Sequence, residues 1–330
     1  MPDSAFPPPP AERAASAIGR TDAGETVLSN GISGEAALTI CVPCWKDSAD
    51  AMIAMLVRME DARSATLILY DDGSADDAMS RKLAHHIARF PGPARLVTSH
   101  KNMGRAHARN RLMALAETDW ILFLDADMRP DDEHFIARYL EAINNSDGPA
   151  LIAGGFSLRH ARPTAETALH AAQSNASEIV DAETRAREPG RYVFTSNILV
   201  HKQVMADVGF DDGFTGWGWE DVDWGLNVAG KFPVIHIDNP ASHLGLDRTD
   251  AILSKFGGSG HNFARLAERH PDAVQSMPLY RMARRFRQLP ARPFWRAITR
   301  TGAGQNWLPM KLRLACLKTY RALAYAEYLK

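Results

Sequence analysis

The sequence predicts an α/β fold in which helices flank a mostly parallel sheet. Short apolar runs alternate with amphipathic segments across residues 38–124, which is the pattern of a doubly wound parallel sheet. Polar turns also follow three of these runs, at Pro43, at Asp71-Asp72 and at Asp125-Ala126-Asp127. Because parallel strands end at one edge of a sheet, and ligands bind there, we expect a functional site at that edge.

Individual elements follow from apolar spacing and from turn residues. Met79, Leu83 and Ile87 recur at helical intervals, whereas Ile121 to Leu124 form a continuous apolar run typical of a strand buried on both faces. Pro43 is expected to end the first strand. We predict strands at 38–42, 66–70, 94–98, 120–124, 151–156, 192–200 and 234–237, and helices at 49–61, 76–90, 104–116, 131–144, 164–188, from 202, and up to 229.

Composition limits the classes of protein to which the chain can belong. Its 330 residues, 45% hydrophobic with a net charge of −1, suit one large α/β core with appendages or two modest domains. The near-neutral charge gives no general basis for nucleic-acid binding. Cys41, Cys44 and Cys316 form no disulfide framework and are interpreted as reduced packing residues. No apolar run is long enough to suggest a signal peptide or a membrane span.

The two carboxylates after the central strand indicate a cation site. In an Asp-x-Asp on extended chain, both side chains point the same way, so Asp125 and Asp127 can approach one ion. A few carboxylate oxygens, with water or phosphate in the remaining positions, are typical of Mg²⁺ or Mn²⁺ bound to a nucleotide. The alternative is a polar turn that caps a helix beginning near Asp131.

These residues together resemble family 2 glycosyltransferases, which have the Rossmann-like GT-A fold. The resemblance covers roughly residues 37–265 and depends on the order and spacing of several stretches rather than on any one of them. The donor-side stretches are Val42-Pro43, Tyr70 to Ser74, Asn102 to Asn110 and Asp125-Ala126-Asp127. Gly216 to Asp221, with His243 downstream, resembles the acceptor side of chondroitin-polymerase and β-1,4-galactosyltransferase relatives.

The resemblance implies a set of donor and metal residues. Asp127 matches the principal metal ligand, Asp125 a ribose-side or metal-side partner, and His243 a further ligand for Mn²⁺ or Mg²⁺. A carboxylate at Asp72 would accept from the imide N–H of uracil, unless it caps the helix beginning near Asp76. Helix N-termini and guanidinium groups suit a diphosphate. The implied donor-binding set is Pro43, Asp47, Asp72, Asn102, Arg105, Arg109 and Asp125.

The acceptor side centres on Asp221, which the resemblance implies is the catalytic base. Glu220 would hold sugar hydroxyls, and Trp217, Gly218 and Trp219 would contact the acceptor, because aromatic faces stack on the C–H faces of sugars. Trp219 stands where relatives often have glycine. The alternatives are acidic residues that favour a helix start, and a tight aromatic core turn.

The resemblance and composition together predict the organisation of the chain. Residues 1–36 are expected to be a disordered leader, because they are rich in Pro, Ala, Ser and Gly. Residues 37–130 would form the nucleotide-binding half and 131–265 the acceptor-binding half of one GT-A domain. Residues 266–330 would form a basic amphipathic helical extension, in which residues 280–330 either touch an anionic membrane or pack on the domain with a solvated basic face.

We therefore expect an inverting, metal-dependent glycosyltransferase. It would move a sugar from a nucleotide sugar, preferably UDP-linked, to a glycan or glycolipid acceptor during synthesis of a bacterial surface polymer, in the cytoplasm or peripherally on the inner membrane. No nucleic acid is expected as a partner. One rival is a phosphohydrolase of the haloacid dehalogenase type, although Met128 replaces the usual Thr or Val. The other is a non-catalytic protein that binds nucleotide sugar or glycan.

Overall fold

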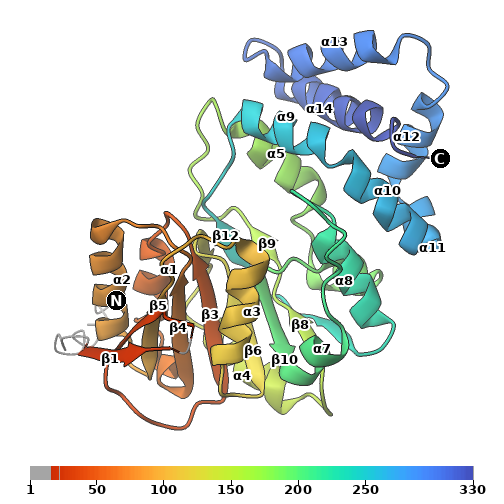
Figure 1. Ribbon diagram of the computed structural model, residues 1–330. Helices are drawn as coiled ribbons and strands as arrows, with labels where there is room; N and C mark the ends of the chain where they lie inside the picture. The colour runs from red at the N-terminus through yellow and green to blue at the C-terminus, as the bar shows by residue number, and fades with distance from the viewer. Residues whose placement is uncertain (1–15, 22, 330) are drawn as a thin grey trace, which may run out of the picture. The chain divides into compact units, whose positions relative to one another are not determined.

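A computed structural model describes residues 16–21 and 23–329 as two compact units (Figure 1). The first unit comprises the chain up to Ser157 together with Thr195–Ala206 and Ile237–His243. The second comprises Leu158–Phe194, Asp207–His236 and the chain from Leu244 onward. The chain is thus divided differently from the predicted boundaries at residues 130 and 265.

The first unit is built on a twisted sheet in the order β1-β2-β5-β4-β3-β6-β10-β8, with a smaller sheet β7-β12-β9. The strands are β1 (Ser16–Arg20), β2 (Thr26–Ser29), β3 (Leu38–Cys44), β4 (Ala65–Asp71), β5 (Ala94–Thr98), β6 (Trp120–Leu124), β7 (Met128–Pro130), β8 (Leu151–Ala153), β9 (Phe156–Ser157), β10 (Asn197–His201) and β12 (Ala241–His243). The helices are α1 (Asp50–Leu56), η1 (Glu60–Ser64), α2 (Asp77–Arg89), α3 (Arg105–Leu115), α4 (Phe135–Asn144) and α7 (Lys202–Asp207).

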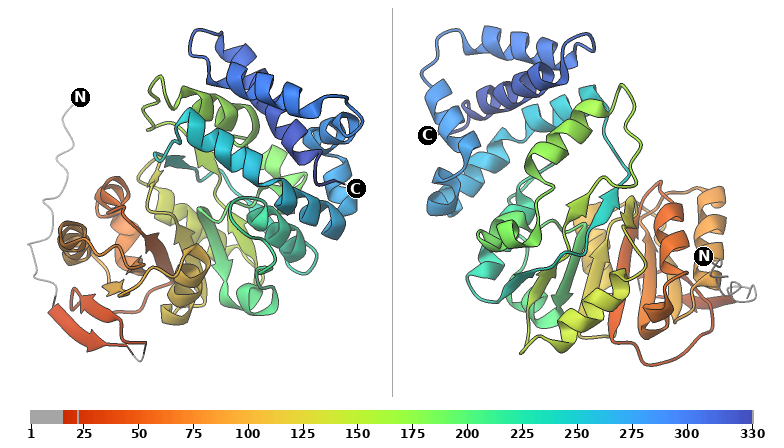
Figure 2. Two further views of the ribbon diagram at one scale, coloured as in Figure 1. Left: turned by 45° about the horizontal axis from the view of Figure 1, so that its top comes forward. Right: turned by 180° about the vertical axis from the view of Figure 1, so that it is seen from behind.

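The predicted α/β architecture is confirmed. β3 pairs in parallel with β4 and β6, and β4 pairs in parallel with β5, while the outer strands pair antiparallel. Helices cover both faces of the sheet (Figures 1 and 2). Apolar side chains of α1, α2 and α4 pack on one face, and Leu112 of α3 lies against Cys41 on the other. The central strands are therefore buried on both sides, as their continuous apolar runs predict.

Two regions of the first unit differ from the expectation. Ser16–Arg20 and Thr26–Ser29, expected in a disordered leader, form the β1–β2 hairpin, and β2 pairs with β5; residues 1–15 and 22 of that leader lie outside the described residues. Pro43 does not end the first strand, which continues to Cys44 along β4. Pairing with β6 covers only Thr39 to Cys41, so the missing N–H of Pro43 breaks no bond on that side.

Helix boundaries differ from the predicted ones where polar side chains accept hydrogen bonds from backbone N–H groups. The helix expected from residue 131 begins at Phe135, because β7 extends to Pro130 and the Asp132 carboxylate accepts from the N–H of His134. The long helix expected over 164–188 is two helices, α5 (Ala168–Ser177) and α6 (Ala182–Ala186). Asp181 starts the second of these by accepting from the N–H of Thr184.

The second unit is mainly helical. Besides α5 and α6 it contains η2 (Pro189–Tyr192), α8 (Glu220–Ala229), β11 (Val234–His236), α9 (Thr249–Gly258), α10 (Gly260–Arg269), α11 (Pro271–Gln275), α12 (Pro278–Phe286), α13 (Arg292–Gly304) and α14 (Met310–Tyr325). The last helix joins two apolar clusters, because Leu317 and Tyr320 belong to one and Tyr325 to the other. α14 is therefore part of the core of this unit.

Two further expectations concern cysteines and membrane spans. Cys41 and Cys44 are buried in β3, and burial raises the pKa of both thiols, which keeps them protonated and inert. They act as packing residues, as predicted. In the described part of the chain, no helix combines the length and apolar character needed to cross a membrane.

Glu25 connects the β1–β2 hairpin to the sheet, and its contacts lead to a prediction about stability. The Glu25 carboxylate, 4% exposed, accepts from Arg111 and from the hydroxyl of Tyr70. These hydrogen bonds, above all that from Arg111, lower the pKa of Glu25 from 4.5 against the opposing effect of burial. Glu25→Gln should therefore lower the free energy of unfolding at pH 7 by about 1–3 kcal/mol, the worth of hydrogen bonds to a buried charge.

The lowered pKa also fixes how this loss varies with pH. The stabilisation by ionised Glu25 is complete above pH 4.5 and disappears as the pH falls through the lower folded-state pKa. Denaturant unfolding at pH 7 and at successively lower pH should show the difference between wild type and variant shrinking in acid. Glu35→Gln, at an exposed position, is the control. An equal loss in both variants would contradict this role.

Candidate active site

The carboxyl end of β6 places Asp125 between two arginines of α3. Arg109 donates to one oxygen of the Asp125 carboxylate at 2.8 Å, and Arg105 donates to the other at 3.0 Å. Arg109 is buried and Arg105 is largely exposed, so one guanidinium is fixed inside the sheet edge while the other reaches solvent. Both arginines stand in the first turns of α3, as the sequence predicts, and they present positive charge where a diphosphate would bind.

Asp127 lies against His243, although the two residues are more than a hundred positions apart in the sequence. β12 pairs antiparallel with β7, and His243 stands opposite Met128, next to Asp127. His243 Nε2 is 3.0 Å from Asp127 Oδ2. Burial opposes ionisation of Asp127, but the His243 contact and the charge of Arg105 outweigh it and hold its pKa below the usual range. Asp127 is therefore an anion at neutral pH.

The donor set at this edge is that of a divalent cation such as Mn²⁺, because a carboxylate oxygen and an imidazole nitrogen meet there. Asp125 accepts from two arginines, whereas Asp127 and His243 contact each other. Within residues 16–21 and 23–329, no group of three His, Cys, Asp or Glu side chains could by itself hold a metal. An ion here would complete its coordination with substrate oxygens and water.

Asp72 holds the loop that leads into α3. Its carboxylate accepts from the N–H groups of Met103 and Gly104 at 2.8–3.2 Å, and its carbonyl accepts from the Asn102 amide. Asp76, not Asp72, caps α2, so the capping alternative for Asp72 is wrong. Gly73 makes this arrangement possible: its φ is +69°, and a Cβ there would lie 2.4 Å from Asn102 N.

Asp71, which the sequence reasoning passed over, carries a buried carboxylate at the end of β4. One of its oxygens accepts from the N–H of Ser74, while Oδ2 is buried without a hydrogen-bond partner. Such an oxygen is costly unless something donates to it. The other predicted residues of this edge lie close by in sequence: Pro43 is half-buried in β3, and the Asp47 carboxylate accepts from the N–H of Ala49 just before α1.

The Gly-Trp segment lies in the second unit, as a loop before α8. Gly216, Gly218 and Trp219 all have positive φ, at 76°, 94° and 78°. The buried Asn262 amide donates to the carbonyls of Thr215 and Gly218 and so holds the turn. Left-handed backbone is unusual for tryptophan, and it is sustained here by the surrounding packing.

Both aromatic residues of this loop are partly covered by helices. The Trp217 ring lies 5.6 Å from Phe256, and the Trp219 ring lies 4.7 Å from Phe263. Trp224, in contrast, is fully buried and donates to the carbonyl of Val208, so the core alternative holds for it. Trp217 and Trp219 each remain partly exposed.

Glu220 and Asp221 are the first residues of α8, and both are partly exposed. Asp223, one turn further, is buried and binds Arg269 and His270, which gives it a structural task. The three acidic residues therefore have different environments. Asp223 has a structural role in packing, whereas Glu220 and Asp221 lie beside the aromatic loop. An acidic first turn also favours the helix dipole, which agrees with the helix-start alternative, and the roles of Glu220 and Asp221 stay predictions.

Tyr325 of α14 is a second residue that sequence reasoning missed. Its hydroxyl is 2.6 Å from Ser259 Oγ, and it accepts from Trp219 Nε1 at 3.0 Å and from Arg321 Nε at 3.0 Å. The Arg321 guanidinium also lies 4.9 Å from the Trp219 ring. No local signal marks Tyr325, because it lies 106 residues from Trp219 in the chain. The C-terminal helix thus supports the loop that precedes Asp221.

Comparison with known proteins finds a family model that matches part of the chain. Residues 39–177 match the family model described as Glycosyl transferase family 2. The matched stretch is less than half of the chain. The match includes β3, β4, β6 and α3, and therefore Asp72, Arg105, Arg109, Asp125 and Asp127. This confirms the coarser part of the sequence resemblance.

One solved structure shows the fold of the chain. A mannosyltransferase from Pyrobaculum calidifontis, solved with GDP-Man and Mn²⁺, matches 89% of this chain and 88% of its own, with a TM-score of 0.54 and 13% identity. The chain therefore has a GT-A-like fold. Residues 1–349 of Staphylococcus aureus TarS match 87% of this chain and 90% of their own, with a TM-score of 0.43 and 11% identity.

A curated relative covers only part of the chain. The teichoic acid poly(glycerol phosphate) polymerase of Staphylococcus epidermidis is 37% identical over 111 residues, which is 32% of this chain. The aligned stretch spans 14% of that much longer protein. The likeness supports relationship in the glycosyltransferase region alone.

The contacts of Tyr325 predict its effect on stability. Tyr325→Phe should lower the free energy of unfolding by about 1–3 kcal/mol, because the partly buried donors of Trp219 and Arg321 lose their acceptor. Tyr328→Phe, at a position that is 45% exposed, is the matched control and should change stability by less than about 0.5 kcal/mol. Urea unfolding of the three proteins measures this difference, and equal stability of the two variants would refute the support that Tyr325 gives to Trp219.

Proposed function

We propose that the chain is an inverting, metal-dependent glycosyltransferase. It takes a sugar from a nucleotide sugar, UDP-linked by preference, and adds it to a glycan or lipid-linked glycan acceptor of a bacterial surface polymer. The family match over residues 39–177 supports the reaction class. The preference for UDP, the acceptor and the inverting chemistry at Asp221 are proposals from the residues.

The observation that carries the proposal is the charge arrangement after β6. Asp127 is ionised beside His243, and the adjacent Asp125 is held by Arg105 and Arg109. One anion is thus available to a cation, and two guanidinium groups lie next to it. A nucleotide diphosphate chelated to a divalent ion has the complementary charges.

The donor nucleotide would lie along the edge that β3, β4 and β6 share. The guanidinium groups of Arg105 and Arg109 at the start of α3 suit phosphate oxygens, and Asp72 fixes the loop that carries Asn102 before them. Asp72 would accept from an imide N–H of the base, as the resemblance implies, with the buried carboxylate of Asp71 next to it in the chain. Pro43 and Asp47 would border the base and ribose.

A divalent ion held by Asp127 and His243 would supply the positive charge that stabilises the departing diphosphate. The remaining chemistry belongs to Asp221. Its carboxylate takes the proton from the acceptor hydroxyl as that oxygen bonds to the anomeric carbon, and the bond from this carbon to the nucleotide diphosphate breaks. Glu220, Trp217, Gly218 and Trp219 would hold the acceptor. Attack opposite the leaving group inverts the anomeric configuration.

The phosphohydrolase alternative finds no support in this geometry. Its nucleophile would be the first aspartate of the Asp-x-Asp, but both oxygens of Asp125 accept from arginines. The family match covers the same residues. The non-catalytic alternative is an outcome of the second experiment below.

Asp127→Ala should abolish metal-dependent donor binding. Calorimetric and thermal-shift titrations of UDP, GDP, CMP and dTDP sugars, each with Mn²⁺, Mg²⁺ or chelator, measure it. We expect one nucleotide class to bind wild type only with metal and to bind the variant at least about tenfold more weakly, because the variant lacks the charged ligand. Asp119→Ala, at the opposite end of the same strand, is the control. If chelator leaves the binding of nucleotide sugar to wild type unchanged, the proposed role of the metal is disproved.

Asp221→Asn should separate chemistry from donor binding. Loss of a general base lowers the turnover of an enzyme by about 10²- to 10⁴-fold, and we expect a loss of this size in sugar transfer. Calorimetric donor binding should be unchanged, because the donor residues lie in the first unit. Asp250→Asn, in the first turn of α9, is the matched control. Normal turnover in Asp221→Asn would show that Asp221 is not the catalytic base. Donor binding by wild type without any turnover would favour the non-catalytic alternative.

A further inference from the structure

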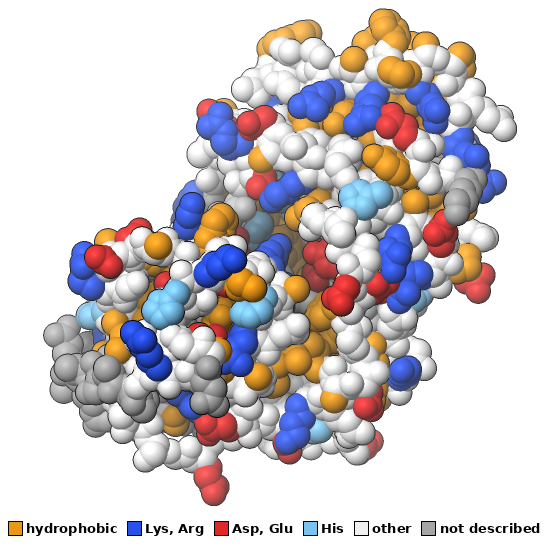
Figure 3. All heavy atoms as spheres, in the orientation of Figure 1, with side chains coloured by type: hydrophobic (Ala, Val, Ile, Leu, Met, Phe, Trp, Pro, Cys, Tyr) orange, Lys and Arg blue, Asp and Glu red, His pale blue; other side chains and the backbone are white. Residues whose placement is uncertain are grey.

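The C-terminal helices expose large apolar side chains on one broad face. Phe294, Trp295 and Ile298 of α13 are 59%, 44% and 45% exposed. Phe294 and Ile298 are one helical turn apart, and Trp295 lies beside them. Trp307, in the connection to α14, is 78% exposed, and Leu312 at the start of α14 is 53% exposed. We call these five residues the α13 patch; Figure 3 shows hydrophobic side chains gathered along the outer edge of α13.

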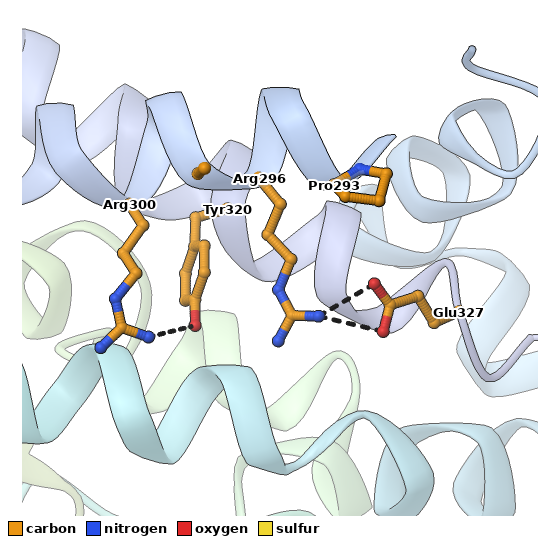
Figure 4. A pocket seen from close by; sticks show the side chains of 6 residues that line it. Pro293, Arg296, Arg300, Tyr320 and Glu327 are labelled. Carbon is orange, nitrogen blue, oxygen red and sulfur yellow. Dashed lines mark hydrogen bonds and ion pairs between the residues drawn. The ribbon is translucent and has the colours of Figure 1, made fainter. Parts of the chain in front are cut away.

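The opposite side of α13 is fixed, so the exposure of the patch is a property of the folded unit. Figure 4 shows Arg296 and Arg300 reaching from α13 toward Tyr320 of α14. Arg296 donates to both oxygens of Glu327 at 2.9 and 3.0 Å, and Arg300 approaches the Tyr320 hydroxyl at 3.4 Å. Ala303, on the packed side, is fully buried. These contacts hold α13 on α14 and leave the patch outward.

The charge around the patch is of one sign. Glu327 is the only acidic residue between 278 and 330, and Arg296 neutralises it. Arg285, Arg287, Lys311 and Lys318 are exposed and contact no carboxylate in the described part of the chain. The whole chain has a net charge of −1, so the positive charge is concentrated in this segment rather than general.

Aromatic and aliphatic side chains on a helix edge, surrounded by cations, have the chemistry of an interfacial membrane contact. Trp and Phe favour the headgroup boundary, and Lys and Arg bind anionic headgroups at about 1 kcal/mol each. Two copies of such a surface would repel one another through their shared positive charge. We propose that the α13 patch and its flanking cations bind the surface of an anionic lipid bilayer.

This proposal resolves the two alternatives that the sequence leaves open for residues 280–330. α14 is the packed helix, because Arg313, Leu317 and Tyr320 are at most 3% exposed. α13 and the following connection form the membrane contact. The inference goes beyond the proposed function, since it concerns where the protein works rather than what it transfers.

Flotation of the full chain with lipid vesicles tests the proposal. The chain should float with vesicles of mixed phosphatidylcholine and phosphatidylglycerol, should remain behind with phosphatidylcholine alone, and should be released as NaCl is raised. The triple variant Phe294→Ser/Ile298→Ser/Trp307→Ser should lower vesicle affinity at least about tenfold, because it removes most of the apolar area that would insert. Lys311→Ala/Lys318→Ala should weaken binding to the mixed vesicles.

The controls separate the patch from general effects. Trp45→Ser/Ile235→Ser removes exposed apolar side chains outside the patch and should float like wild type. Donor binding by the triple variant should equal that of wild type, which separates this proposal from the proposed function. Equal flotation with neutral and mixed vesicles, or wild-type affinity of the triple variant, would overturn the proposal. So would a wild-type dimer that dissociates in the triple variant, because the patch would then bind a second copy.

Discussion

The parallel pairing of β4, β3 and β6 is the constraint on which the donor edge depends. Asp71 lies opposite Cys44 in the register of β4 and β3, and Cys41 lies opposite Phe123 in the register of β3 and β6. β3 and β4 therefore end together, β6 ends about two residues earlier at the same edge, and each is followed by polar residues. Carboxylates gathered in this way repel, and Arg105 and Arg109 relieve that repulsion at Asp125.

Local patterns predicted much of this half correctly. The strand at 94–98 and the helix over 76–90 appear within a residue of the expected bounds, because apolar spacing and a capping aspartate are local signals. Asp125, Arg105 and Arg109 also come together as their positions at a strand end and a helix start imply. The hairpin at 16–29 was missed, because small polar residues give no apolar signal, and β2 is ordered by its pairing with β5.

Local sequence patterns could not predict the contacts between segments that are distant in the chain. The meeting of His243 with Asp127 follows from the β7–β12 register, and β7 is too short to be recognised in the sequence. His243 was found only through a resemblance. Tyr325 was not found at all, since neither its neighbours nor its spacing distinguish it from an ordinary core tyrosine. Local contacts were therefore predicted more successfully than contacts between distant segments.

α14 contributes to two apolar clusters, and its Tyr325 hydroxyl binds the loop before α8. Because α14 makes both sets of contacts, sequence changes in the C-terminal segment would depend on the sequence of the Gly-Trp loop. Insertions and deletions would be accepted at the exposed connection around Trp307, where no core contact is lost. Within α14 they would rotate Tyr325 away from Trp219. Homologues that keep glycine at the position of Trp219 would be free of this restriction, and their C-terminal helices could diverge or disappear.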